Sequence, residues 1–280
     1  MKRLQIGLAL TGFSVFAILL LRFVRVPFMD PGGDASNIAS FVVMGAVFYF
    51  FIKIFKLPSL SYFRLPRLTP ISGLALLIAG AQMYSTISHE DNEMKPWKVA
   101  LPGIIFLFSI GFGEELVSRG FVYGVLKNRS HKAAVLVSSL FFGLMHLNLY
   151  TGTDWDPWLA YWHVASAFCF GFFMCALMVA TQSIWVPMIV HAIFDWNVVF
   201  DKTPPILKDN PPISVSFWEG LVSPFSDFLF LFLPGLIIFG FMYHRRIWLP
   251  LWFKNLAVRI AVRWKLVDET QDKPQFVGQN

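Results

Sequence analysis

The stretch VALPGIIFLFSIGFGEELVSRGFVYGVL, residues 99–126, is apolar enough to cross a membrane, yet its second half carries Glu114, Glu115 and Arg119. A membrane-spanning helix needs about 20 mostly apolar residues, so this stretch predicts one long span. Charged side chains inside a bilayer are costly and usually face the interior of a helix bundle or a water-filled cavity. The stretch therefore predicts a transmembrane helix with a polar, functional face.

The composition as a whole indicates a membrane protein. The 280 residues are 56% hydrophobic and 14% charged, with a mean hydropathy of +0.60, whereas soluble domains carry about 25% charged residues. We assign the formal charge of +6 to basic loops and a basic tail on the cytoplasmic side, so it gives no indication of nucleic-acid binding. Cys169 and Cys175 share one apolar segment without CxxC spacing, which indicates buried core residues.

Hydropathy predicts an all-α, polytopic membrane protein of about eight transmembrane helices, with a site in the interior of the bundle. We expect residues 1–280 to form a single membrane domain, with a core of motifs over about 99–200 and a basic interfacial tail over about 245–280. The predicted spans are Leu4–Leu21, Ile38–Phe55, Ile71–Ile87, Val99–Leu126, Ala133–Leu149, Trp158–Thr181, Ile184–Phe200 and Pro224–Tyr243.

Alternate connections are basic, and the others are acidic or mixed, so the positive-inside rule predicts that both termini are cytoplasmic. Arg22 and Arg25 fall on the opposite face as an exception. Two interpretations of Arg246–Val267 remain open: an interfacial stretch on anionic lipid, or a simple positive-inside anchor. Compact size and the absence of targeting signals favour a bacterial plasma membrane.

A few polar residues inside the predicted spans are candidates for chemistry. Glu115 and Arg119 are four residues apart, the favourable order for an ion pair on one helix face. Glu114 lies about 100° around the helix from Glu115, so it is left free of that pair. The other candidates are His146 in the fifth span, and His191 and Asp195, again four apart, in the seventh.

The remaining candidates receive simpler interpretations. Four histidines are expected to be solvated or interfacial, because they fall in loops or at span ends: His89, His131, His163 and His244. Asp227 lies close to the start of the last span and is also expected at the interface. HExxH, GxGD and GxSG motifs and a phosphate-binding glycine loop are all missing from the sequence, which argues against zincin-like, aspartyl and rhomboid-type membrane proteases.

Three motifs resemble those of a known family when they are taken in order. EELVSR (114–119) fits EExxxR, FGLMH (142–146) fits FxxxH, and HAIFD (191–195) fits HxxxN/D. Together they resemble the CAAX protease and bacteriocin-processing family of intramembrane proteases, also called the Abi family, over residues 111–197. The resemblance implies an eight-helix membrane fold and an endopeptidase.

The resemblance also implies roles for individual residues. Glu114 matches the general base that activates water, and Glu115 with Arg119 matches the pair that supports it. His146 matches the histidine that holds the water. No Ser or Cys nucleophile belongs to this set, so the expected reaction is peptide-bond hydrolysis without an acyl-enzyme.

His191 and Asp195 match the pair that stabilises the oxyanion, although the CAAX endoprotease has Asn at the position of Asp195. An ionised Asp cannot donate a hydrogen bond, whereas Asn can. Three outcomes are open for the surplus negative charge: a protonated Asp195, a cationic His191, or a divalent metal. A metal such as zinc would use Glu114, His146, His191 and Asp195; no cofactor is required otherwise, and we favour the metal-free alternative.

The sequence thus predicts an intramembrane endopeptidase of glutamate or metal type, acting on membrane proteins or peptides within a lipid bilayer. Two alternatives are kept: a non-catalytic scaffold or immunity protein of the same fold, and a proton-coupled transporter that uses Glu114 and the histidines as a relay. The sequence does not indicate the oligomeric state or whether the substrate is prenylated.

Overall fold

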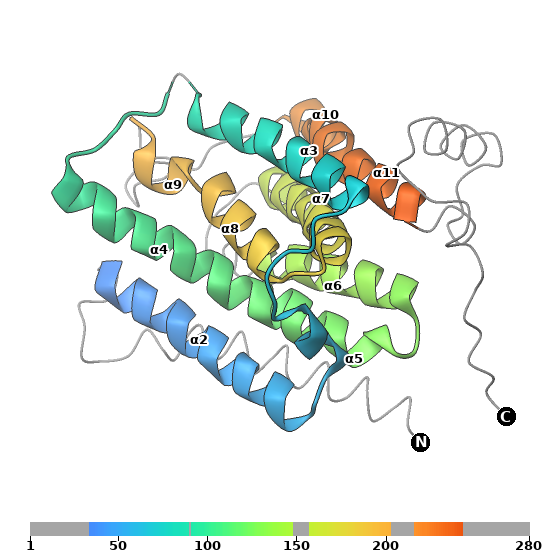
Figure 1. The fold of residues 1–280 in the computed structure, drawn as a ribbon. Coiled ribbons are helices and arrows are strands. Elements are labelled where there is room, and N and C mark those ends of the chain that lie inside the picture. Colours follow the sequence, from blue (N-terminus) through green and yellow to red (C-terminus); the bar gives the residue numbers. More distant parts are fainter. Residues whose placement is uncertain (1–33, 90, 148–156, 203–215, 243–280) are drawn as a thin grey trace, which may run out of the picture.

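The structure is a computed structural model that describes residues 34–89, 91–147, 157–202 and 216–242 (Figure 1). These residues form helices and no strand; an isolated bridge joins Asn92 to Asp201. The helical elements are α2 (Asp34–Ile54), η1 (Pro58–Tyr62), α3 (Pro70–Ile87), α4 (Trp97–Glu115), η2 (Leu116–Val122), α5 (Tyr123–Lys127), α6 (His131–Met145), α7 (Pro157–Thr181), α8 (Trp185–Phe194), α9 (Asn197–Phe200), α10 (Phe217–Asp227), η4 (Phe228–Phe232) and α11 (Leu233–Met242).

Five of the described helical stretches are long and apolar enough to cross a membrane, which confirms the all-α membrane class. They are Asn37–Ile54, Pro70–Ile87, Trp97–Lys127, Pro157–Thr181 and Pro224–Met242. His131–Met145 and Trp185–Phe200 are apolar but shorter. The predicted count of eight is not established, because the expected first span Leu4–Leu21 lies outside the described residues. Arg22, Arg25, His244 and the predicted basic tail also lie outside the described residues.

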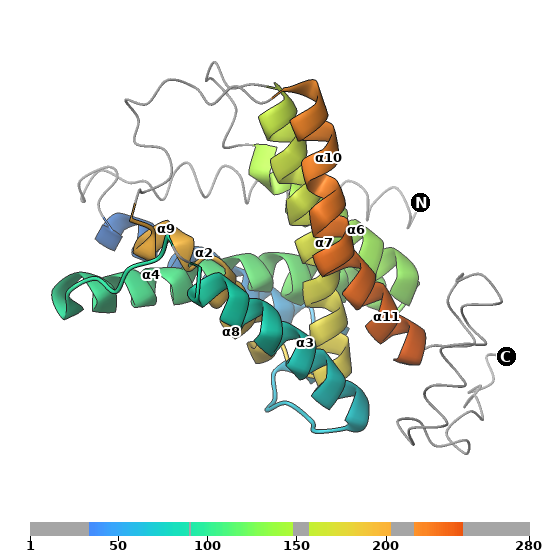
Figure 2. The same cartoon turned by 90° about the horizontal axis from the view of Figure 1, so that it is seen from above.

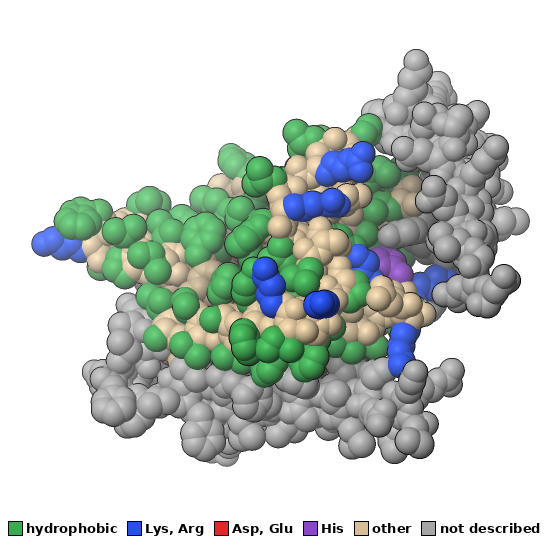
Figure 3. Space-filling view, turned by 60° about the horizontal axis from the view of Figure 1, so that its bottom comes forward, with side chains coloured by type: hydrophobic (Ala, Val, Ile, Leu, Met, Phe, Trp, Pro, Cys, Tyr) green, Lys and Arg blue, Asp and Glu red, His purple; other side chains and the backbone are tan. Residues whose placement is uncertain are grey.

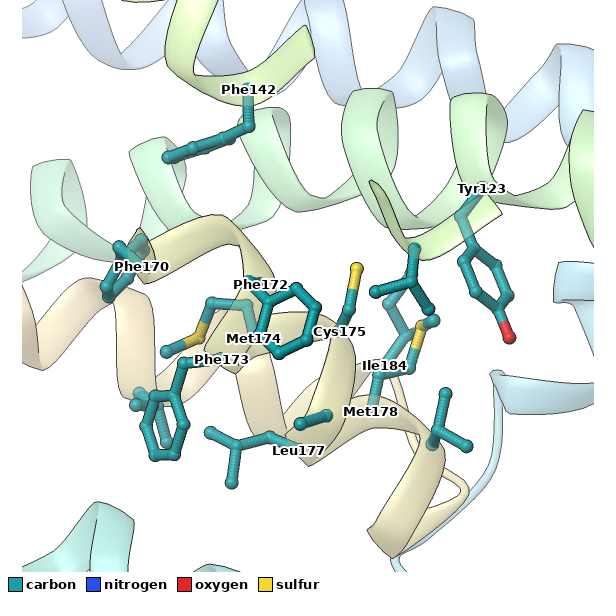
Figure 4. Packing of buried hydrophobic residues seen from close by; sticks show 14 of the residues in the cluster. Tyr123, Phe142, Phe170, Phe172, Phe173, Met174, Cys175, Leu177, Met178 and Ile184 are labelled. Atoms are coloured by element: carbon teal, nitrogen blue, oxygen red, sulfur yellow. The ribbon is translucent and has the colours of Figure 1, made fainter. Parts of the chain in front are cut away.

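α7 occupies the centre of the bundle. Every side chain from Ala176 to Ala180 is buried, so this turn of the helix contacts protein on every side. Helix α7 packs against α6, α3, α8, α10 and α11, and Figure 2 shows α7, α10 and α11 running across the direction of α4. Figure 4 shows its apolar side chains meeting Phe142 and Tyr123 from neighbouring helices, and both cysteines are buried as predicted.

Two helix starts near the basic connections are fixed by capping side chains. Thr69 and Ser72 form a reciprocal capping box at the start of α3, with Pro70 in its first turn. Ser130 Oγ accepts from the backbone N–H of Ala133 at the start of α6, at 3.2 Å. Such caps satisfy amide groups that a helix start leaves without a partner.

Backbone contacts gather the described basic connections at one end of the bundle. Ile184 N donates to Tyr62 O at 2.9 Å and Arg67 N donates to Thr181 O at 2.8 Å, which ties the α7–α8 turn to the segment after α2. We call this region the basic end; its cations are Lys53, Lys56, Arg64, Arg67, Lys127, Arg129 and Lys132. Figure 3 shows a face on which Lys and Arg side chains gather and no Asp or Glu appears among the described residues.

Two glycines let the helices that carry the site come into backbone contact. A β-carbon at Gly111 of α4 would lie 2.5 Å from the carbonyl oxygen of Met188 in α8. A β-carbon at Gly143 of α6 would lie 2.7 Å from the carbonyl oxygen of Val164 in α7. Real β-carbons do not approach this closely, so these positions require glycine. The two glycines therefore allow close contact between α8 and α4 and between α7 and α6. Both contacts lie within a few residues of the predicted site residues in the sequence.

Candidate active site

The carboxylates of the EELVSR motif lie where the long helix changes its winding. α4 ends at Glu115, η2 continues as a π-helix over Leu116–Val122, and α5 resumes the regular winding. Single π-helical turns inside α-helices are rare and are frequent at functional sites. The predicted span Val99–Leu126 is therefore confirmed as one continuous helix, Trp97–Lys127, with a feature that hydropathy did not reveal.

Glu115 and Arg119 form the predicted ion pair, with Arg119 Nη1 3.1 Å from Glu115 Oε1 and both side chains fully buried. Both terminal nitrogens of Arg119 make further contacts, while its Nε is buried without a hydrogen-bond partner among the described residues. Its Nη1 donates to Ser118 Oγ at 2.6 Å, its Nη2 donates to the carbonyl oxygen of Gly171 at 3.0 Å, and its guanidinium stacks 4.5 Å from the ring centre of Phe142. These contacts join α6 and α7 to the π-helical segment.

Glu115 also reaches His191, which the sequence did not predict. His191 Nδ1 lies 2.9 Å from Glu115 Oε1, the same oxygen that faces Arg119. Because a carboxylate can only accept here, Nδ1 of His191 carries the proton and donates it. Glu115 therefore orients the imidazole of α8 as well as the guanidinium of η2.

The other nitrogen of His191 faces two further carboxylates. Nε2 lies 3.5 Å from Asp195 Oδ2 and 3.8 Å from Glu114 Oε2. His191 is almost fully buried, while the side chains of Glu114 and Asp195 are 15% and 29% exposed. The predicted convergence of Glu114, His191 and Asp195 is thus present, and the two carboxylates lie on its accessible side.

His146 belongs to the same region but stands at a helix end. Its Nδ1 lies 2.9 Å from the carbonyl oxygen of Phe142, which can only accept, so Nδ1 carries the proton and Nε2 is left as a possible acceptor. The ring of Phe142 joins the two histidines, with its centre 4.9 Å from that of His146 and 5.6 Å from that of His191.

The structure corrects where two candidates lie in their helices. We expected His146 and Asp195 inside continuous spans, but each is the first residue after its helix: α6 ends at Met145 and α8 ends at Phe194. The predicted span Ile184–Phe200 is broken there into α8 and α9. The negative end of the α8 dipole therefore meets the Asp195 carboxylate, which disfavours its charged form, while it favours a cationic His191 in the last turn.

His163 contacts His146, and the sequence analysis did not predict this neighbour. His163 is partly buried in the second turn of α7, and its ring centre lies 4.8 Å from that of His146, edge to face. It is therefore not a fully solvated side chain, and its interfacial position stays a prediction. His131, the first residue of α6, is also partly buried, with Nδ1 2.9 Å from the hydroxyl of Tyr123. An isolated histidine within an apolar run was the only signal available for His163.

Asp227 is the fourth residue of the apolar stretch Pro224–Met242, so it lies close to the start of that span, as predicted. Helix α10 itself begins ten residues before Asp227, at Phe217. The Asp227 carboxylate is partly buried, lies 3.4 Å from Nε1 of Trp162 and accepts a short hydrogen bond from Ser166. Asp227 therefore joins α10 to α7 and lies apart from the carboxylates of the EELVSR motif.

The arrangement of Glu114, His146, His191 and Asp195 shows whether these residues could together bind a metal ion. Within the described ranges, no group of three or more His, Cys, Asp and Glu side chains is placed to hold a metal ion. Both nitrogens of His191 already face carboxylates, and one nitrogen of His146 is occupied by the Phe142 carbonyl. As they stand, Glu114, His146, His191 and Asp195 do not fit a zinc site, so no step is derived through a metal.

The fold and site define an integral membrane protein, all-helical in its described residues, with a cluster of acidic and imidazole groups at the meeting of α4, η2, α6, α7 and α8. Residues 96–197 match the family model described as type II CAAX prenyl endopeptidase Rce1-like, which confirms the resemblance drawn from the three motifs. This is a protease family, and the match supports an endopeptidase. A comparison with curated proteins finds no match.

Proposed function

We propose that this protein is an intramembrane endopeptidase that hydrolyses a peptide bond near the C-terminus of prenylated, membrane-associated proteins. The observation that carries the proposal is the convergence of Glu114 and Asp195 on Nε2 of His191, with Glu115 holding the opposite nitrogen. The match of residues 96–197 to a family of CAAX prenyl endopeptidases supports the substrate class.

The proposed reaction begins with Glu114. Its Oε2 is buried and accepts no hydrogen bond from the described residues, so it is free to take a proton from a water molecule. Nε2 of His146 holds that water as the oxygen attacks the peptide carbonyl carbon. Glu114 then gives the proton to the leaving amine as the carbon–nitrogen bond breaks, so that no covalent enzyme intermediate forms.

The oxyanion of the tetrahedral intermediate needs hydrogen-bond donors. His191 is placed to be cationic, because Nδ1–H donates to Glu115 and Nε2 faces two carboxylates rather than a donor. Asp195 supplies a second donor when it is protonated. With Glu114, Glu115, Arg119 and His191 charged and Asp195 neutral, the negative and positive charges in the site cancel, which a low-dielectric interior favours.

The orientation in the membrane forms part of the proposal. We place the basic end and both termini in the cytoplasm, because Lys and Arg concentrate in cytoplasmic connections. The acidic connections then lie on the other side, where Asn92 pairs with Asp201.

The test is cleavage by the purified protein in liposomes. A prenylated peptide ending in a CAAX sequence and its unprenylated twin would be compared by mass spectrometry of the released tripeptide. We expect cleavage of the prenylated peptide by the wild type and by Glu93→Gln, a matched change at a glutamate remote from the site, and loss in Glu114→Gln. If both peptides were cleaved equally, a prenyl group would not be required. If neither peptide were cleaved, the proposed activity would be contradicted. Substrate trapping with Glu114→Gln, followed by proteomics, would then identify natural substrates.

A further inference from the structure

A short segment at the basic end displays leucines to the outside. Residues 63–69, FRLPRLT, connect η1 to α3, and we call them the strap. Leu65 is 85% exposed and Leu68 is 79% exposed, the two highest values among the exposed large hydrophobic side chains of the described residues. They alternate with Arg64 and Arg67. Two leucines exposed to this extent within four residues, on a helix bundle that spans a membrane, are compatible with contact to lipid.

The strap is held in place by the α7–α8 turn. Arg64 Nε donates to the carbonyl oxygen of Gln182 at 3.1 Å, and a second guanidinium nitrogen donates to the Gln182 side chain. Ser183 Oγ donates to the carbonyl oxygen of Arg64 at 2.6 Å, and Arg67 N donates to Thr181 O at 2.8 Å. These bonds fix the backbone on both sides of Leu65, so its exposure is a property of the fold.

Aromatic contacts indicate the depth of the strap relative to the bilayer. The ring of Phe63 packs inward, with its centre 5.2 Å from that of Tyr49 and 6.4 Å from that of Trp185. Tyr49 and Trp185 are themselves exposed, and Lys53 lies over the Tyr49 ring at 5.5 Å. Exposed Trp and Tyr beside Lys are typical of the level at which lipid headgroups begin. The strap therefore lies at the interface.

Charge determines what kind of headgroup fits there. The guanidinium of Arg64 is occupied by Gln182, whereas Arg67 is exposed and its side chain makes no ion pair or hydrogen bond within the described part of the chain. Lys53 and Lys56 are exposed at the end of α2, and the face in Figure 3 shows no acidic side chain among the described residues. A free guanidinium beside exposed leucines matches a lipid with an anionic phosphate headgroup.

We propose that the strap is a binding surface for anionic phospholipids, with Leu65 and Leu68 inserted at the boundary between headgroups and acyl chains and Arg67 in contact with the phosphate. This surface is distinct from the catalytic residues, and the proposal does not depend on the protease activity. Because the strap is bonded to the turn that precedes α8, the lipid surface and the helix that carries His191 share one rigid support.

The depth of the strap can be measured by spin labelling in phosphatidylglycerol-containing nanodiscs. A nitroxide would be attached to Leu68→Cys, and its collision rates with oxygen and with a water-soluble nickel complex would be compared. Leu77→Cys on α3, also highly exposed, is the lipid-facing control, and Asn128→Cys in the α5–α6 turn is the aqueous control. We expect Leu68→Cys to favour oxygen, as Leu77→Cys does; behaviour like that of Asn128→Cys would overturn the proposal.

The headgroup can be tested with photoreactive phosphatidylglycerol and phosphatidylcholine, by mapping adducts on the peptide that contains the strap. We expect a preference for phosphatidylglycerol and, in Arg67→Gln, a loss of about fivefold in that preference, the effect of one basic residue near an anionic surface. Lys95→Gln, in the connection between α3 and α4, is the matched control and should leave the preference unchanged. Equal labelling by both lipids in the wild type, or an unchanged preference in Arg67→Gln, would overturn the anionic headgroup. Neither measurement depends on peptide cleavage.

Discussion

Glu115 and His191, residues from two helices that are 76 positions apart in the chain, share a hydrogen bond of 2.9 Å in the fully buried part of the site. The same Glu115 oxygen faces Arg119 at 3.1 Å. One carboxylate thus faces the guanidinium and orients the imidazole ring of His191, in the way that carboxylates orient catalytic histidines. The supporting pair predicted from the sequence is therefore a group of three.

This arrangement predicts that Arg119→Ala lowers stability as well as activity. Removing one partner of a buried ion pair leaves the other charge without compensation, which typically costs about 3–5 kcal/mol. Thermal unfolding in detergent would measure the loss, with Arg129→Ala, an exposed arginine in the α5–α6 turn, as the control. Equal melting temperatures for the wild type and Arg119→Ala would contradict a structural role for the pair.

Glu114→Gln is expected to separate activity from stability. The amide has nearly the shape of the carboxylate but cannot accept a proton, and loss of a general base lowers rates by about 10² to 10⁴. Because Glu114 accepts no hydrogen bond through Oε2 from the described residues, the melting temperature should stay close to that of the wild type. Cleavage at the wild-type rate would show that Glu114 is not the base.

His163→Ala tests whether the imidazole beside His146 positions it. The variant removes the edge-to-face ring contact of 4.8 Å. We expect kcat to fall by about tenfold, which is less than the roughly 10²- to 10⁴-fold loss for removal of a general base, with KM little changed. His163→Phe restores a ring at this place and should recover much of the loss. Tyr161→Ala, exposed on the same helix, is the matched control. A wild-type kcat in His163→Ala would exclude the positioning role.

Asp227 offers a stability test away from the site. Its carboxylate accepts from Ser166 and faces Trp162, and it joins α10 to α7 within an apolar environment. Asp227→Leu should lower the melting temperature in detergent, because the partly buried Ser166 hydroxyl then loses its acceptor, and a hydrogen bond to a charged group typically contributes about 1.5–3 kcal/mol. Asp227→Asn keeps an acceptor and serves as the control. An unchanged melting temperature in Asp227→Leu would show that this contact contributes nothing.

Hydropathy predicted the described long helices well, because a run of about 20 apolar residues has few alternatives in a membrane chain. The predicted spans Ile71–Ile87 and Trp158–Thr181 differ from α3 and α7 by one residue at the start. Helix interruptions were not predictable in this way. The break at Asp195 and the π-helical winding of η2 occur inside apolar stretches, and hydropathy does not distinguish one helical winding from another.

Helical spacing predicted contacts within one helix but not between helices. Glu115 with Arg119, and His191 with Asp195, follow from a separation of four residues. The contacts of His191 with Glu115 and of His163 with His146 depend on how close the helices pack. That distance is set by small residues such as Gly111 and Gly143, whose role cannot be recognised in a single sequence that contains 19 glycines.

Asp195 is the residue at which this chain departs from the asparagine of the CAAX endoprotease, and Asp195→Asn distinguishes the possible roles. A carboxyl group donates a hydrogen bond only while it is protonated, whereas an amide donates at every pH. If Asp195 is a neutral donor, the variant should keep its activity and extend it to higher pH, where the acid loses its proton. If Asp195 is a metal ligand, the neutral oxygen should bind the metal more weakly, so activity should fall and added zinc should restore part of it. The measurement is a pH–rate profile of both proteins with and without a chelator, alongside the metal content of each. Chelator inhibition that zinc reverses, with stoichiometric metal in the wild type, would overturn the metal-free mechanism, because the carboxylates around His191 would then have to rearrange around the ion.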